Sequence, residues 1–79
     1  MVKMKIITKI EIEMIKQIFT PGTVVVCDYM DDPQPVPSGT KGVVTCVDSI
    51  GQIHVNWENG STLALNYEVD KFHEYAGRE

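Results

Sequence analysis

Three carboxylates at the start of a proline-rich segment are the first residues of this chain whose types could do chemistry. Asp31 and Asp32 are adjacent, and Asp28 lies three residues before Asp31. Oxygen ligands of this kind bind divalent cations, but a calcium loop needs six or more oxygens at set spacings, which this segment lacks. An aspartate before a proline commonly accepts a hydrogen bond from the backbone that follows it. We therefore expect no metal site here, and a turn or a partner contact for the acidic pair.

The histidines, serines and cysteines do not form a catalytic set. Nucleophilic catalysis needs a nucleophile, a base and a group that orients the base. His54 and His73 are the only imidazoles, and the serines, at positions 38, 49 and 61, all fall in expected turns. Cys27 and Cys46 lie in apolar runs without metal-binding spacing, so we expect packed free thiols of a reducing, cytoplasmic compartment. The sequence predicts no enzyme and no cofactor.

Aromatic side chains near the proline-rich segment offer the sharpest candidate site. Trp57, the only tryptophan, alternates with apolar strand residues, which favours the core over a role as a binding anchor. Tyr29 and Tyr67 could join it as the floor of a groove, with Asp31 and Asp32 at the rim. An aromatic floor with an acidic rim suits a basic or proline-rich peptide. These five residues are the expected partner-binding set.

One amphipathic helix, over residues 8–19, is expected before the strands. Thr8 is a good N-cap, and Glu11 three residues later completes a capping box. Pro21 disfavours helical geometry in the residue before it and ends the helix. Apolar residues cover roughly 200° of the helix, about twice what packing against one sheet requires. The helix therefore has either a second contact surface, such as a homodimer interface, or one stray exposed isoleucine.

From residue 23 onward the pattern is β. Short strands are expected over residues 24–27, 43–47, 52–57 and 62–65, with a last one ending near residue 75. Asn59-Gly60 is the strongest hairpin signal, because a type I′ turn needs positive φ twice. We expect the helix to cover the outward-facing valines Val24, Val26 and Val43.

These elements predict a mainly β fold: a small SH3-like β-barrel of about five short antiparallel strands preceded by one amphipathic helix. Residues 8–79 are expected to form this single domain, and residues 1–7 an N-terminal arm. No run approaches the length of a membrane span, and no signal peptide is visible.

The charge of the chain is divided unevenly. The net charge is −4, but residues 1–20 carry +2 and residues 21–79 carry −6. An acidic barrel repels phosphate backbones, so the charge argues against nucleic acid as a partner. The alternative is a nucleic-acid accessory protein that binds through the basic N-terminal lysines Lys3, Lys5, Lys9 and Lys16. An acidic decoy that mimics DNA is a weaker alternative, because its carboxylates are scattered among turns.

Several motifs together resemble a known family. They are Met30-Asp31-Asp32-Pro33, Pro37-x-Gly39-Thr40-x-Gly42-x-Val44, Val47-Asp48, Gly51-Gln52-Ile53 and Trp57-x-Asn59-Gly60-x-x-Leu63-x-Leu65. Over about residues 15–75 the chain resembles a small uncharacterised "domain of unknown function" family, number 4314, of bacteria, phages and other mobile elements. Shorter pieces also resemble KOW segments of translation factors and the repeats of Mind-bomb-type ubiquitin ligases. The resemblance implies a binding or adaptor module for an unidentified protein or peptide.

Overall fold

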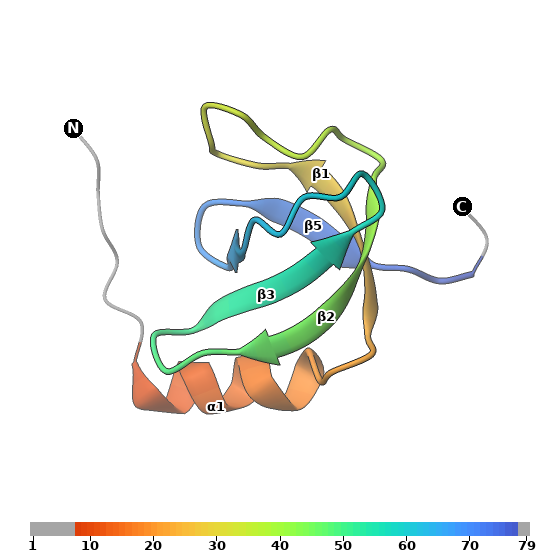
Figure 1. Cartoon of the computed structure of the whole chain (residues 1–79). Helices are drawn as coiled ribbons and strands as arrows, with labels where there is room; N and C mark the ends of the chain where they lie inside the picture. The colour runs from red at the N-terminus through yellow and green to blue at the C-terminus, as the bar shows by residue number, and fades with distance from the viewer. Residues whose placement is uncertain (1–7, 78–79) are drawn as a thin grey trace.

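The computed structural model describes residues 8–77, so the expected arm at residues 1–7 lies outside the described residues. The described elements are α1 (Lys9–Ile18), β1 (Val24–Tyr29), β2 (Lys41–Val47), β3 (Gln52–Trp57), β4 (Leu65–Asn66) and β5 (Lys71–Glu74). The strands form one antiparallel sheet in the order β4-β3-β2-β1-β5 (Figure 1). The mainly β fold with one N-terminal helix and five short strands is confirmed. The sheet does not close, so "barrel" describes it only approximately.

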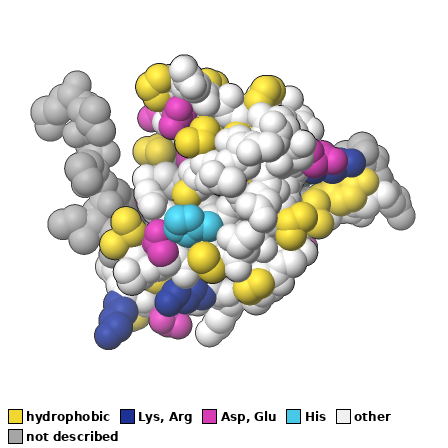
Figure 2. All heavy atoms as spheres, in the orientation of Figure 1, with side chains coloured by type: hydrophobic (Ala, Val, Ile, Leu, Met, Phe, Trp, Pro, Cys, Tyr) yellow, Lys and Arg dark blue, Asp and Glu magenta, His cyan; other side chains and the backbone are white. Residues whose placement is uncertain are grey.

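α1 begins with the predicted capping box. Thr8 Oγ1 accepts a hydrogen bond from the Glu11 N–H at 3.2 Å, and Glu11 Oε1 accepts one from the Thr8 N–H at 3.2 Å. These bonds satisfy donors that the first helical turn leaves without a partner. α1 lies beside β2 (Figure 1), and Figure 2 shows basic and acidic side chains next to one another over it.

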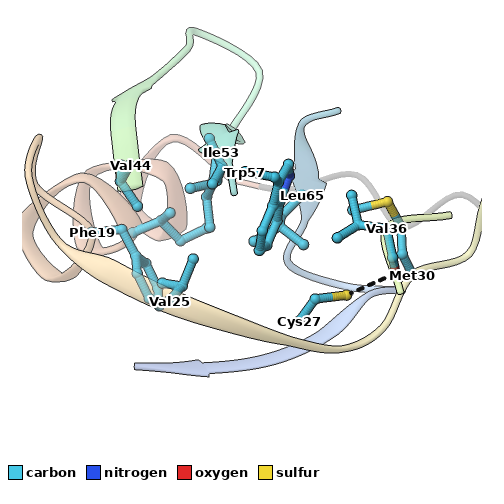
Figure 3. Packing of buried hydrophobic residues seen from close by; sticks show 11 residues of the cluster. Phe19, Val25, Cys27, Met30, Val36, Val44, Ile53, Trp57 and Leu65 are labelled. Carbon is cyan, nitrogen blue, oxygen red and sulfur yellow. Dashed lines mark hydrogen bonds between the residues drawn. The ribbon is translucent and has the colours of Figure 1, made fainter. Parts of the chain in front are cut away.

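The core occupies the inner face of the curved sheet. Ile15 and Phe19 join it from α1, and Trp57 is only 4% exposed, with its Nε1 donating to the Leu63 carbonyl at 2.9 Å. Figure 3 shows Phe19 and Trp57 among the labelled side chains that point into the interior enclosed by the curved sheet. The other buried members of the cluster are Val25, Cys27, Met30, Val36, Val44, Ile53, Val55 and Leu65. Trp57 therefore has the core position that its alternation favours.

The expected position of the helix is wrong. Val43 is 44% exposed, and Val26, although buried, does not belong to the cluster that contains Ile15 and Phe19. α1 covers the inner face of the sheet instead of its outward valines. Ile15 and Phe19 of α1 pack on the core cluster of the inner face, and burying two large side chains there removes more apolar surface from water than a cover over exposed valines would.

The turn between β3 and β4 has the predicted position but a different type. Among residues 8–77 only glycines have positive φ, so Asn59 does not, while Gly60 has φ 88°. The Gly60 N–H donates to the Trp57 carbonyl and the Trp57 N–H donates to the Ser61 carbonyl, both at 3.0 Å. This is a type I turn followed by a left-handed glycine, the usual three-residue hairpin loop. The strand expected over residues 62–65 is reduced to Leu65–Asn66.

The two cysteines differ in burial. Both are free thiols, and Cys27 is buried with its Sγ donating to the Val36 carbonyl at 3.4 Å. Cys46 is exposed, so the expectation of a packed thiol is wrong there. The β2–β3 register shifts between Val44 and Cys46, and this irregularity places Cys46 opposite His54 on the outer face. A register shift of this kind reverses the face to which the following residues point.

Candidate functional site

Three aromatic rings pack together where the end of α1 meets β5. The ring centroids of Phe19 and Phe72 are 5.3 Å apart, and the Tyr67 centroid lies 6.2 Å from each of them. All three pairs are tilted or edge-on, which the ring quadrupoles favour. The rings line a surface depression, which we call the aromatic hollow. Its lining residues are Phe19, Asp28, Tyr67, Asp70, Lys71 and Phe72.

Asp70 fixes the wall of the aromatic hollow. Its side chain is buried, and its two carboxylate oxygens accept hydrogen bonds from the Asp31 N–H at 2.8 Å and the Asn66 N–H at 2.7 Å. Charge-assisted bonds of this kind are among the strongest in proteins. Asp70 therefore ties the start of the proline-rich loop to the turn before β5 and holds Asp31 beside the hollow.

Asp28 contributes a second carboxylate. The β1–β5 register shifts between Cys27 and Tyr29, so Asp28 is the extra residue of a β-bulge. Its Oδ2 lies 2.8 Å from His73 Nδ1, and both side chains remain more than 40% exposed. His73 thus holds the Asp28 carboxylate in place at the margin of the hollow.

The structure separates the five residues predicted to bind a partner. Tyr67 lines the aromatic hollow, and Asp31 is held beside it. Tyr29 is 58% exposed and lies opposite Lys71, but it does not line the hollow. Trp57 is in the core, and Asp32 lines a different depression between the proline-rich loop and the β3–β4 turn.

The structural interpretation of Asp32 is supported by its own contact. Asp32 Oδ1 accepts a hydrogen bond from the Gln34 N–H at 2.8 Å, which is the local turn expected for an aspartate before a proline.

Sequence reasoning missed Asp70, Phe19 and Phe72 as site residues. The available signal for Asp70 was its position directly before a strand, where aspartates commonly cap the preceding turn.

A second polar cluster lies on the outer face of β2 and β3. His54 Nε2 is 2.8 Å from Asp48 Oδ2, and Asp48 Oδ1 accepts hydrogen bonds from the N–H groups of Ile50 and Gln52 at 3.1 and 2.9 Å. Burial alone would raise the pKa of Asp48, but the bonds from His54, Gln52 and Ile50 outweigh it and hold this pKa below its ordinary value. This cluster braces the β2–β3 turn.

Two further observations limit what the described residues can do. Within residues 8–77, no group of three or more His, Cys, Asp or Glu side chains is arranged to hold a metal ion. In the same part of the chain, no helix has both the length and the apolar character needed to cross a membrane.

Comparison with known proteins identifies one related family. The model of the family described as "Domain of unknown function (DUF4314)" matches residues 8–75, which include α1 and all five strands. This confirms the resemblance indicated by the sequence motifs. No curated protein and no solved structure gave a match.

Proposed function

We propose that this chain, which belongs to the family described as Domain of unknown function (DUF4314), is a small adaptor module that binds a basic segment of a partner protein in the aromatic hollow. The observation that carries the proposal is the group of three packed rings flanked by the carboxylates of Asp28 and Asp70. Rigid aromatic surface provides contact area at low entropic cost, and the exposed Asp28 carboxylate selects the charge of the partner, while the buried Asp70 carboxylate holds the wall of the hollow.

The charge of the domain supports a basic partner. Residues 21–79 carry a net charge of −6, so a lysine- or arginine-rich segment is attracted before it makes contact. Asp31 lies beside the hollow with its side chain exposed, where it can pair with an approaching cation. Lys71 also lines the hollow, and its positive charge repels basic side chains of the partner from its own position. The basic residues of the bound segment should therefore lie on the side of the carboxylates, which fixes the orientation of the segment.

Binding of nucleic acid through the basic lysines is the alternative function. Lys3 and Lys5 lie outside the described residues. The other two lysines of this set, Lys9 and Lys16, are described. Lys16 has its Nζ 4.0 Å from Glu13 Oε1, so part of its charge is already balanced. The same proposal includes a non-enzymatic role, a cytoplasmic location and an origin in a bacterial mobile element or phage. The free thiols support the cytoplasmic location, and the motif resemblance supports the other two parts.

Selection from a displayed random-peptide library tests the proposal. The double variant Asp28→Asn/Asp31→Asn removes two charges at the hollow, and the amide that replaces the Asp28 carboxylate can still form a hydrogen bond with His73 Nδ1. The matched control, Glu13→Gln/Glu58→Gln, removes two exposed charges away from the hollow.

We expect the wild-type and control proteins to enrich peptides with Lys or Arg next to apolar residues. The Asp28→Asn/Asp31→Asn variant should bind the enriched peptides at least about tenfold more weakly, a loss of about 1.4 kcal/mol, with an unchanged melting curve. Equal binding by this variant, or enrichment of acidic peptides, would contradict the proposal. Self-association through residues 8–19 would use a different surface, the outward face of α1.

A further inference from the structure

The aromatic hollow presents ring surface and a carboxylate in one depression. Tyr67 and Phe72 both line it, and their rings meet edge-on at an interplanar angle of 75°. Tyr67 is 48% exposed, whereas Phe19, the third ring of the group, is buried. The ring surface that a partner can reach therefore belongs mainly to Tyr67, with Phe72 beside it.

Asp28 lies in the same hollow and has hydrogen-bonding capacity to spare. An ionised carboxylate has two oxygens with about four acceptor sites between them. Within residues 8–77, the side-chain partner of Asp28 is His73, whose Nδ1 lies 2.8 Å from Oδ2, and the Asp28 side chain remains 47% exposed. Asp28 can therefore accept further hydrogen bonds from a donor that enters the hollow.

The lysine of the hollow does not use these groups. Lys71 lines the hollow, but its ammonium makes no ion pair and no ring contact with any residue in the described part of the chain. The exposed surface of the Tyr67 ring and the remaining acceptor sites of Asp28 are thus available to a cation of the partner.

We propose that the anchor of the bound segment is an arginine, whose guanidinium stacks on the Tyr67 ring and donates hydrogen bonds to the Asp28 carboxylate. This inference rests on the proposed function, because it names the residue that the hollow selects from a basic segment. A guanidinium is planar, so it can lie flat on a ring while its N–H groups, which point outward in the same plane, reach a carboxylate beside that ring. A ring and a carboxylate in one depression match this geometry.

Lysine fits the same groups less well. Its ammonium is a compact, strongly hydrated point charge, so it loses more hydration on contact with apolar ring surface than a guanidinium does. It also has no flat face with which to cover the Tyr67 ring while it pairs with Asp28. The hollow should therefore distinguish two side chains of equal charge.

Two capped peptides of equal charge test this distinction. The probes are acetyl-Gly-Arg-Gly-amide and acetyl-Gly-Lys-Gly-amide, each titrated into the wild-type protein and followed by NMR chemical shifts. We expect the arginine peptide to shift the Tyr67 ring and Asp28 amide signals with a dissociation constant in the millimolar range, and the lysine peptide to bind at least about fivefold more weakly.

Equal binding of the two peptides would overturn the arginine anchor and leave the proposed binding of a basic segment intact. Shifts confined to residues outside the hollow, or no shifts with either peptide, would also overturn it. The proposed function has its own test in the peptide selection, so the two failures are distinguishable.

Three substitutions separate the two contacts of the guanidinium. Tyr67→Leu removes the ring and Asp28→Asn removes the charge, so each should weaken binding of the arginine peptide at least about fivefold. Tyr67→Phe keeps a ring and should bind this peptide within about twofold of the wild type. Both positions are well exposed, so the variants should fold, and their NMR spectra report this directly.

Tyr75→Leu is the matched control for the loss of a tyrosine ring. Tyr75 does not line the hollow, and its ring is already contacted by Lys41, whose Nζ lies 4.2 Å from the ring centroid. This variant should bind the arginine peptide as the wild type does. An equal loss in Tyr75→Leu and Tyr67→Leu, or an unchanged preference for arginine in both Tyr67→Leu and Asp28→Asn, would refute the stacked geometry.

Discussion

Replacing Asp70 tests whether one buried carboxylate holds the binding site together. Asp70 is 6% exposed and accepts hydrogen bonds from the Asp31 and Asn66 N–H groups at 2.8 and 2.7 Å. Asp70→Ala removes both bonds and leaves two partly buried donors without an acceptor. The loop that carries Asp31 then loses its link to the turn before β5, so the site and the fold should weaken together.

The magnitude follows from the two bonds. Hydrogen bonds to charged groups contribute about 1.5–3 kcal/mol each, and water can reach the partly buried donors and recover some of the loss. We therefore expect Asp70→Ala to lower the free energy of unfolding by about 3 kcal/mol. For a domain of this size, that change corresponds to a melting temperature lower by roughly 12–24 °C. Asp70→Asn keeps one acceptor oxygen and should lose about half as much.

Thermal and urea unfolding followed by circular dichroism measure this effect. Asp31→Ala is the matched control, because Asp31 contributes its backbone N–H to the bond and its side chain is exposed. The control should change stability by no more than about 0.5 kcal/mol. A loss below about 0.5 kcal/mol in Asp70→Ala, or an equal loss in Asp31→Ala, would refute the role that we assign to Asp70.

Three further predictions concern packing, acid stability and thiol reactivity. Gly42→Ala should destabilise the fold by about 1–3 kcal/mol in urea unfolding, because the added methyl would overlap Val55 Cγ1 and lie 2.6 Å from Trp57 Cε3. Unchanged stability would show that both side chains move aside freely. The folded-state pKa of Asp48 is lowered from 3.8, so its contribution to the free energy of unfolding is present above pH 3.8 and is lost as the pH falls through that folded-state pKa. In this acidic range, the free energy of unfolding of Asp48→Asn should depend less on pH than that of the wild type. An equal pH dependence of the two proteins would argue against this role of Asp48. Cys46 is exposed and should react at once with a thiol reagent in the native protein. Cys27 should react only on unfolding, because it is buried and its pKa is raised by burial and then by nearby carboxylates. A single rapid reaction phase for both thiols would contradict the structure.

Local features of this chain could be predicted from its sequence, because the residues that form them are close in the chain. The capping box depends on Thr8 and Glu11, three residues apart, and the turn after β3 depends on Gly60 within its own hairpin. The backbone bond of Asp32 is equally local. In each case the chemistry of a few neighbouring side chains determines the geometry.

The composition of the site depended on features that the sequence does not display. Register shifts next to Asp28 and Thr45 change the face to which later residues point, and strand alternation alone does not reveal where a bulge falls. Cys46 is therefore exposed, and Tyr29 lies outside the hollow. The bond between the Asp31 backbone and Asp70 joins residues 39 positions apart, so only the folded chain brings them together.

Capture from a bacterial lysate, performed in parallel with and without nuclease, tests the central claim most directly. The account predicts that the immobilised wild-type protein retains a protein partner that survives nuclease treatment. The Asp28→Asn/Asp31→Asn variant should lose this partner, while Glu13→Gln/Glu58→Gln keeps it. Capture that disappears with nuclease, or that is equal for both variants, would contradict the account, because binding would then depend on nucleic acid or on another surface.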